Sequence, residues 1–163
     1  IYSLYISTSC KINLKFENMN HLQIAITQIE KAEIPKGSNW GEHVQKYLIS
    51  VGITFPASWC MAFVYWCCKQ SNPNTPLIKT GGVLAQWNQI PAKYKVKTPL
   101  PGDIFIMDFG GGKGHTGFVE SVSGDVIQTI EGNSNDEGSR EGYEVCRKPG
   151  GRKISSMKGF IRP

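Results

Sequence analysis

The fold of this chain is decided by residues 58–68, which read SWCMAFVYWCC. This stretch follows Pro56 and is apolar on nearly every side of a helix. A helix without a polar face must be covered by protein in most directions. The sequence therefore predicts a central, buried helix with Ser58 as its N-cap.

Cys60 would occupy the second position of this helix. Unpaired backbone N–H groups and the positive end of the helix dipole meet at a helix N-terminus, and both favour a thiolate over a thiol. The Cys60 N–H would also be one donor to an oxyanion that develops during acyl transfer. A buried structural cysteine is the ordinary alternative, and Cys60 taken alone favours it. Cys67 and Cys68 are predicted to be buried apolar residues of the same helix.

Helices come first in the chain and strands second. Asn20, with Gln23 three residues later, predicts a capped helix, and a second helix is expected from Asn39 to a stop at Gly52. A short helix is expected over residues 83–90, followed by a connector rich in proline and lysine over residues 91–102. Strands are expected at residues 104–109, 115–122, 126–131, 143–147 and 159–162. This order predicts an α+β domain in which N-terminal helices and the central helix pack on an antiparallel sheet.

A hairpin register predicts the neighbours of His115. With the turn centred on Gly124, residues whose numbers sum to about 248 face each other, so His115 lies opposite Asn133. Strand alternation places Glu131 on the same face as Asn133, as a diagonal neighbour within reach of the imidazole. Gly117 shares this face and would let another backbone approach, which we expect to be the helix of Cys60. Each residue alone has an ordinary structural explanation; together they favour a Cys-His site.

Four motifs in order resemble the CHAP family, the cysteine, histidine-dependent amidohydrolases and peptidases. They are WCMAFV at residues 59–64, PGDI at 101–104, GHTGFV at 114–119 and IEGN at 130–133. The resemblance runs from about residue 20 to the C-terminus and implies a papain-like fold. It divides the chain into an N-terminal extension, residues 1–18, and a hydrolase domain, residues 19–163. It also implies hydrolysis of amide bonds in bacterial peptidoglycan, with Cys60 as nucleophile, His115 as base, and Glu131 and Asn133 as polar partners of the histidine.

Two positions depart from the family pattern. Met61 follows the cysteine where a small residue is common, which predicts a narrower cleft. Some members bind calcium through aspartate-rich loops before the nucleophile, whereas this chain has no aspartate before Asp103. We therefore expect no structural metal and no cofactor.

Composition limits the setting in which the protein works. The chain has 163 residues and a net charge of +5, and its lysines and arginines are scattered, which favours an ordinary solvated surface over nucleic-acid binding. No run of about 18 apolar residues predicts a membrane span, and no signal peptide is visible. We expect a monomer that acts on the wall after secretion or in the periplasm.

The resemblance leaves several functions open. The bond cut is either that between N-acetylmuramic acid and L-alanine or a peptide bond of the stem or cross-bridge. The source is a phage lysin, a wall-remodelling enzyme or an antibacterial effector, and an effector would have an inhibitory immunity protein as partner. The alternatives are a catalytically idle wall-binding module and an intracellular thiol hydrolase or acyltransferase.

Overall fold

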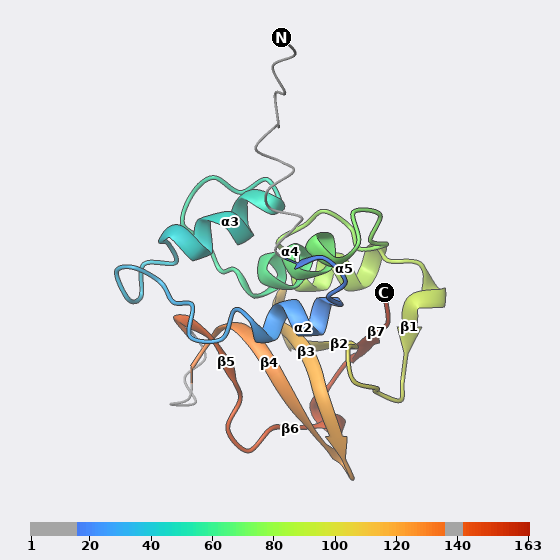
Figure 1. Ribbon diagram of the computed structural model, residues 1–163. Helices are drawn as coiled ribbons and strands as arrows, with labels where there is room; N and C mark the ends of the chain where they lie inside the picture. Colours follow the sequence, from blue (N-terminus) through green and yellow to red (C-terminus); the bar gives the residue numbers. More distant parts are fainter. Residues whose placement is uncertain (1–15, 136–141) are drawn as a thin grey trace.

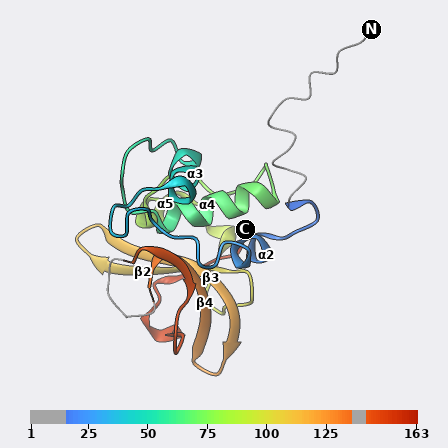
Figure 2. The ribbon, with the colours of Figure 1, turned by 60° about the vertical axis from the view of Figure 1, so that its left-hand side comes forward.

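The computed structural model describes residues 16–135 and 142–163. Helices form one layer and strands another (Figure 1), and a view turned by 60° shows the same two layers (Figure 2). The helices are α2 (His21–Ile26), α3 (Glu42–Ser50), α4 (Cys60–Ser71) and α5 (Val83–Gln89), with the 3-10 turns η2 (Ala92–Tyr94) and η3 (Ile154–Ser156). No helix in the described part of the chain is long and apolar enough to cross a membrane.

The strands form one antiparallel sheet in the order β1-β7-β2-β3-β4-β5, with β6 paired to β4. Their bounds are β1 (Lys95–Val96), β2 (Ile104–Gly110), β3 (Lys113–Ser123), β4 (Val126–Ser134), β5 (Glu144–Arg147), β6 (Arg152–Lys153) and β7 (Gly159–Ile161). The predicted α+β class, with helices packed on an antiparallel sheet in the papain-like manner, is confirmed.

The two N-terminal helices differ in how well the sequence predicted their starts. Asn20 and Gln23 form the predicted capping box of α2. Helix α3 begins at Glu42, after the expected start at Asn39, because Asn39 and Gly41 both have positive φ angles that no helix accepts. A Cβ on Gly41 would lie 2.7 Å from the backbone nitrogen of Ile34, so this turn requires glycine.

Helix α4 is the predicted central helix, and every residue from Cys60 to Cys68 is buried. The predicted N-cap was wrong: Trp59 occupies that position, and Cys60 is the first helical residue. Trp59 is fully buried, stacks on Tyr47 with ring centroids 5.6 Å apart, and donates from Nε1 to buried Glu33 at 2.9 Å. The start of α4 is therefore fixed by these contacts of Trp59, since no side chain caps the helix.

The close approach of α4 to the sheet occurs at Gly132 in β4. A Cβ there would lie 2.8 Å from the side chains of Trp59 and Phe63. The prediction that Gly117 makes room for this helix was wrong, because a Cβ on Gly117 would instead meet Ile130 O at 2.6 Å within the sheet. Gly132 thus sets the distance between the helix that carries Cys60 and the strand that carries Glu131.

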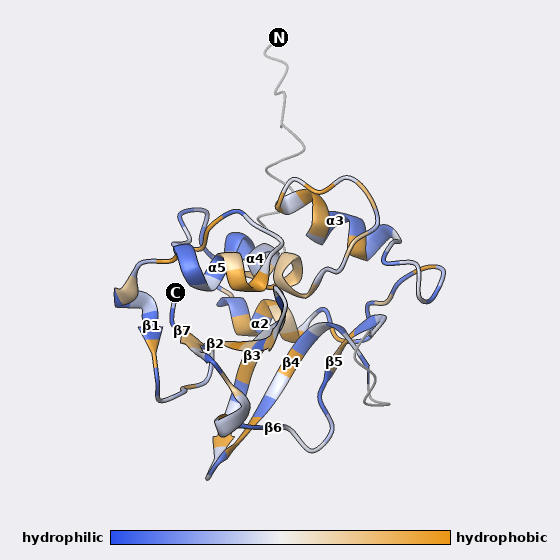
Figure 3. Cartoon of the chain, turned by 180° about the vertical axis from the view of Figure 1, so that it is seen from behind, coloured by the Kyte–Doolittle hydropathy of each residue, from blue (hydrophilic) through white to orange (hydrophobic). Residues whose placement is uncertain are grey.

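Strand β4 carries buried polar residues among apolar ones, and both hydropathy colours appear along it in Figure 3. Ile127 and Ile130 are fully buried, and so are Thr129 and Glu131. A buried polar group is costly unless it is hydrogen-bonded. The polar residues of β4 therefore need partners, and those partners lie in the site described below.

The N-terminal boundary stays a prediction, as does the division of the chain into two parts. Phe16, on the extension side of residue 18, is buried and meets the Trp66 ring edge-on with centroids 5.6 Å apart. Residues 1–15, most of the predicted extension, lie outside the described residues.

Candidate active site

A cleft of about 370 Å³ lies where the N-terminus of α4 meets the ends of β3 and β4. Its lining includes Cys60 from α4, His115 from β3 and Asn133 from β4, together with Ser58 and Lys113. Most of the remaining lining residues are glycines; they are Gly81, Gly82, Val83, Phe109, Gly112 and Gly114. The structure thus brings together three of the four predicted site residues at one surface, and places Glu131 directly behind them.

Cys60 lies at the helix N-terminus and is 6% exposed. The first backbone hydrogen bond of α4 runs from the Phe63 N–H to Trp59 O. Helix geometry therefore leaves the N–H groups of residues 60–62 without intrahelical acceptors. These groups and the helix dipole are placed to stabilise an oxyanion that forms beside Cys60.

His115 connects Cys60 to Glu131. Its Nε2 lies 2.7 Å from Glu131 Oε2, so the other ring nitrogen, Nδ1, is left for Cys60. Burial disfavours the imidazolium, but the hydrogen bonds and charges of Cys60 and Glu131 outweigh burial and raise the pKa of His115 to about 9. A neutral imidazole that donates from Nε2 to the carboxylate presents Nδ1 as an acceptor to the thiol.

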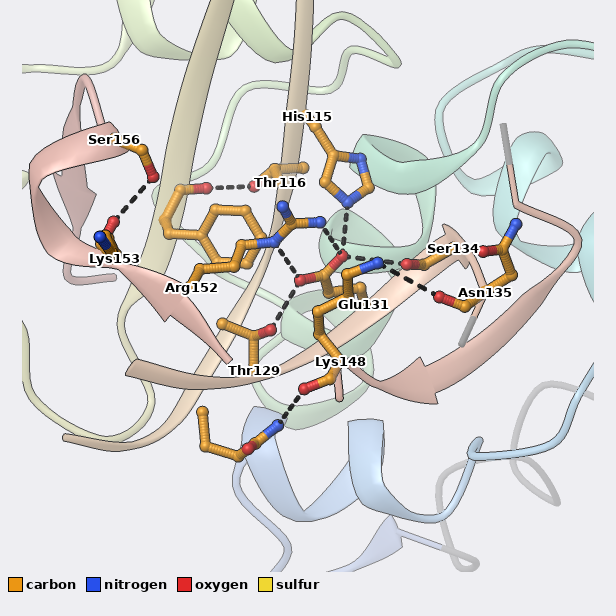
Figure 4. Close-up of polar contacts among 12 residues, drawn as sticks. His115, Thr116, Thr129, Glu131, Ser134, Asn135, Lys148, Arg152, Lys153 and Ser156 are labelled. Carbon is orange, nitrogen blue, oxygen red and sulfur yellow. Dashed lines mark hydrogen bonds and ion pairs between the residues drawn. The ribbon is translucent and has the colours of Figure 1, made fainter. Parts of the chain in front are cut away.

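Glu131 is fully buried, and polar side chains surround its carboxylate (Figure 4). Oε1 accepts from Thr129 Oγ1 at 2.6 Å, while Oε2 accepts from Ser134 Oγ at 3.1 Å as well as from His115. Arg152 donates to both oxygens, from Nε at 2.5 Å and from Nη2 at 2.7 Å. Burial alone would raise the pKa of Glu131, but the hydrogen bonds from Arg152 and His115 hold it well below its usual range.

Sequence reasoning missed Arg152, which comes from β6 and pairs across the ladder with Ile127 of β4. Its guanidinium carbon lies 5.6 Å from the centroid of the Phe105 ring. A two-residue strand has no periodicity to detect, so nothing in the local sequence pointed to this position. Thr129 could have been found, because strand alternation places it on the face of Glu131.

Asn133 has a different position from the one predicted. Its side chain lines the cleft, is 8% exposed, and its Oδ1 has no hydrogen-bond partner among the described residues. The prediction that Asn133 is the nearer partner of His115 was wrong, because Glu131 takes Nε2. Asn133 has a φ of +53°, which breaks the regular alternation of β4 on which the prediction depended.

The predicted hairpin register is off by one residue near the turn and correct at the pairs nearest the site. Near the turn Ser123 pairs with Val126, and a shift between Val119 and Ser121 brings Phe118 opposite Ile130. The residue numbers of that last pair sum to 248, as predicted. A one-residue bulge therefore corrects the offset of the turn and brings Glu131 within reach of His115.

Among residues 16–135 and 142–163, no group of three or more His, Cys, Asp or Glu side chains is arranged to hold a metal ion. The donors around Glu131 are cationic or hydroxylic, and a carboxylate paired with an arginine is a poor metal ligand. The expectation of no structural metal and no cofactor stays a prediction.

Comparison with known families adds one finding to this geometry. The family model of the CHAP domain matches residues 52–133, about half of the chain. The chain belongs to the CHAP family. The CHAP domain implies an amidase or peptidase that acts on peptidoglycan, at the cell wall. Cys60, His115, Glu131 and Asn133 lie inside the matched CHAP segment, whereas Arg152 lies outside it. Searches of curated proteins and of solved structures found no match.

Proposed function

We propose that this chain is a cysteine amidase or endopeptidase that hydrolyses an amide bond of peptidoglycan. The observation that carries the proposal is the arrangement of His115, which contacts Cys60 on one side and buried Glu131 on the other, at the floor of an open cleft. A nucleophile, a base and a group that orients the base are the parts that thiol-dependent acyl transfer requires.

The reaction starts from the thiolate–imidazolium pair, in which the proton of the Cys60 thiol is carried by Nδ1 of His115. The thiolate attacks the carbonyl carbon of the amide, and the oxyanion that forms is stabilised by the Cys60 N–H at the start of α4. His115 then gives its proton to the leaving amine, and the carbon–nitrogen bond breaks to leave a thioester on Cys60. In the second half His115 takes a proton from water, and hydroxide attack releases the carboxylate and regenerates the thiol.

Glu131 and Asn133 have separate roles in this proposal. Glu131 orients the imidazole and stabilises its protonated form, since it lies at Nε2 and carries a charge. Asn133 faces the cleft, where its unpartnered Oδ1 is placed to accept a hydrogen bond from a substrate N–H. The two polar residues of the IEGN motif thus serve the histidine and the substrate, respectively.

The candidate bonds are the N-acetylmuramoyl-L-alanine amide and the peptide bonds of the stem and cross-bridge. The cleft is open and has glycine-rich walls, which suits an extended and branched polymer. A substrate in the wall places the working protein outside the cytoplasm, as a phage lysin, a wall-remodelling enzyme or an antibacterial effector. In the last case we expect an inhibitory immunity protein to bind it.

Digestion of purified peptidoglycan tests the proposal. The full chain should clear a suspension of sacculi, and mass spectrometry of the released fragments should show one new amine and one new carboxylate for each bond cut. A free lactyl carboxylate on the sugar identifies an amidase, and a free amine within the peptide identifies an endopeptidase. Sacculi that remain intact with the folded protein would contradict the proposed activity.

A further inference from the structure

Arg152 is the cation that bonds Glu131 directly, and it lies outside the segment matched by the CHAP model. We propose that Arg152 is a positioning residue of the hydrolytic centre, which fixes the charge and orientation of Glu131 and thereby sets the pH range in which Cys60 and His115 react. The inference rests on the proposed function, since it assigns Cys60 and His115 the roles of nucleophile and base.

The orientation of the Glu131 carboxylate follows from the geometry of its pairing with the Arg152 guanidinium. The guanidinium of Arg152 donates to both oxygens of Glu131, so the planes of the two groups are held together. Thr129 and Ser134 each donate to one further side of the carboxylate. The remaining acceptor direction of Oε2 is the one that His115 Nε2 uses. Rotation of the carboxylate would break several of these bonds at once, so the imidazole meets an acceptor that does not move.

The negative charge of Glu131 also depends on Arg152, because Glu131 is buried. Glu131 is fully buried, and an isolated buried carboxylate takes up a proton rather than stay charged. His115 alone cannot prevent this, because the proposed reaction makes it neutral in some steps and positive in others. Arg152 keeps its charge at every step, since a guanidinium does not titrate in the working range. It therefore keeps Glu131 ionised when the imidazole is neutral.

Other titratable groups also face this cluster. Cys60 comes from α4 and His115 from β3, while Cys146 of β5 pairs with Glu131 across the ladder. The charge of Glu144 raises the pKa of Cys146, and the charge of Lys148 lowers it. Among these groups Arg152 is the cation that bonds Glu131 directly. Removal of Arg152 therefore takes one positive charge away from the cluster.

The sign of the effect is fixed by that charge. In the acid limb His115 is an imidazolium and still holds Glu131 ionised, so loss of Arg152 removes one positive charge with no compensating protonation. The cysteine–histidine pair therefore loses its first proton at a higher pH. The expected shift is roughly one pH unit, the order for one charge within about 8 Å at an effective dielectric constant of about 20. A purely structural role would lower stability or reactivity at every pH and leave the midpoint in place.

The test is the pH dependence of Cys60 alkylation by iodoacetamide, read by peptide mapping of the full chain. No wall substrate is needed, so failure here is distinguishable from failure of the proposed function. In Arg152→Gln the alkylation rate should rise with pH around a midpoint that lies roughly one pH unit above that of the wild type. In Arg152→Lys this midpoint should stay within a few tenths of a unit of the wild-type value. An unchanged midpoint in folded Arg152→Gln would overturn the proposal.

Arg147→Gln is the matched control. Arg147 makes the same kind of fork to Glu120 on the same sheet, but its side chain is half exposed and its partner is not part of the site. This variant removes the same charge from the chain and should leave the midpoint at the wild-type value. A shift equal to that of Arg152→Gln would show that net charge alone is responsible and would overturn the specific role of Arg152.

A second comparison removes the titration of Glu131 and covers the case in which Arg152→Gln does not fold. The double variant Glu131→Gln with Arg152→Gln has no buried charge left unpaired by the change. Its alkylation midpoint should lie above that of Glu131→Gln alone, because only a cation distinguishes the two proteins. Equal midpoints would contradict the inference.

Discussion

Nε2 of His115 lies 2.7 Å from Oε2 of Glu131, and this contact decides which nitrogen of the imidazole faces Cys60. Glu131 lies behind the histidine and His115 is only 12% exposed, so the pair is shielded from solvent. The carboxylate favours the imidazolium, and the imidazolium is the acid that the leaving amine requires. The pH dependence of hydrolysis should therefore follow His115.

We expect kcat/KM to fall as the pH rises through about 9, where His115 loses its proton. Glu131→Gln removes the charge that favours the imidazolium, so the pKa of His115 falls and the alkaline limb moves to lower pH. The rate should fall roughly 10²-fold to 10⁴-fold. Initial rates of peptidoglycan solubilisation between pH 6 and 10 measure both effects. An alkaline limb that stays in place in Glu131→Gln would contradict this assignment.

The same pKa predicts a pH-dependent stability. The folded-state pKa of His115 is about 9, above its usual value of 6.5, so its contribution is fully present below pH 6.5 and is lost as the pH rises towards 9. The contribution is at most about 3 kcal/mol. Urea unfolding at pH 6 and pH 9 should show this loss in the wild type and not in His115→Gln. An equal loss in both proteins would assign the titration to another group.

Asn133 should matter less to the fold than Glu131 and still matter to the reaction. Its φ of +53° is tolerated by glycine, so Asn133→Gly removes the amide without backbone strain. We expect a raised KM and a melting temperature close to wild type, because Oδ1 has no partner among the described residues. Glu131→Ala should instead lose about 3 to 5 kcal/mol of stability, since it leaves Arg152 unpaired. Equal losses of stability in the two variants would contradict the separate roles.

Gly132→Ala should displace the start of α4, and with it Cys60, although Gly132 itself does not line the cleft. The added Cβ would overlap the Trp59 and Phe63 side chains, and overpacking of this kind costs about 1 to 3 kcal/mol. Cys60 moves with the start of α4, so its alkylation rate should fall as well. Gly124→Ala is the control, with a φ of +61° and no atom within 4 Å of the added carbon. It should lose some stability through backbone strain but keep the reactivity of Cys60.

The N-terminal boundary can be tested with two shortened chains. Phe16 is buried against Trp66. The free energy of unfolding of a chain that begins at Met19 should therefore be lower by about 3 kcal/mol or more than that of a chain that begins at Phe16. Thermal unfolding of the two chains measures the difference. Equal melting temperatures would support the predicted boundary between residues 18 and 19.

Local patterns in the sequence predicted the elements that local interactions determine. The Asn20 capping box involves residues three apart, and the all-apolar surface of residues 60–68 requires burial wherever the helix lies. The strand pairing followed from the turn at Gly124. These features could be predicted because the physical cause lies within a few residues of its effect.

Contacts between distant segments escaped prediction. The N-terminus of α4 depends on the bond between Trp59 and Glu33, and the state of Glu131 depends on Arg152 from a two-residue strand. The orientation of Asn133 depends on one positive φ at the end of β4. None of these has a periodicity or a spacing of its own. The family motifs indicated which residues meet, while the three-dimensional packing determines which partner each one takes.

The most direct measurement of the central claim is muropeptide release by Cys60→Ala, compared with Cys68→Ala. Both cysteines are buried in α4, but only Cys60 lines the cleft. We expect Cys60→Ala to keep the wild-type circular dichroism and to lose activity by a factor of about 10⁴ or more, while Cys68→Ala releases the same fragments at close to the wild-type rate. Wild-type release by folded Cys60→Ala would contradict the account.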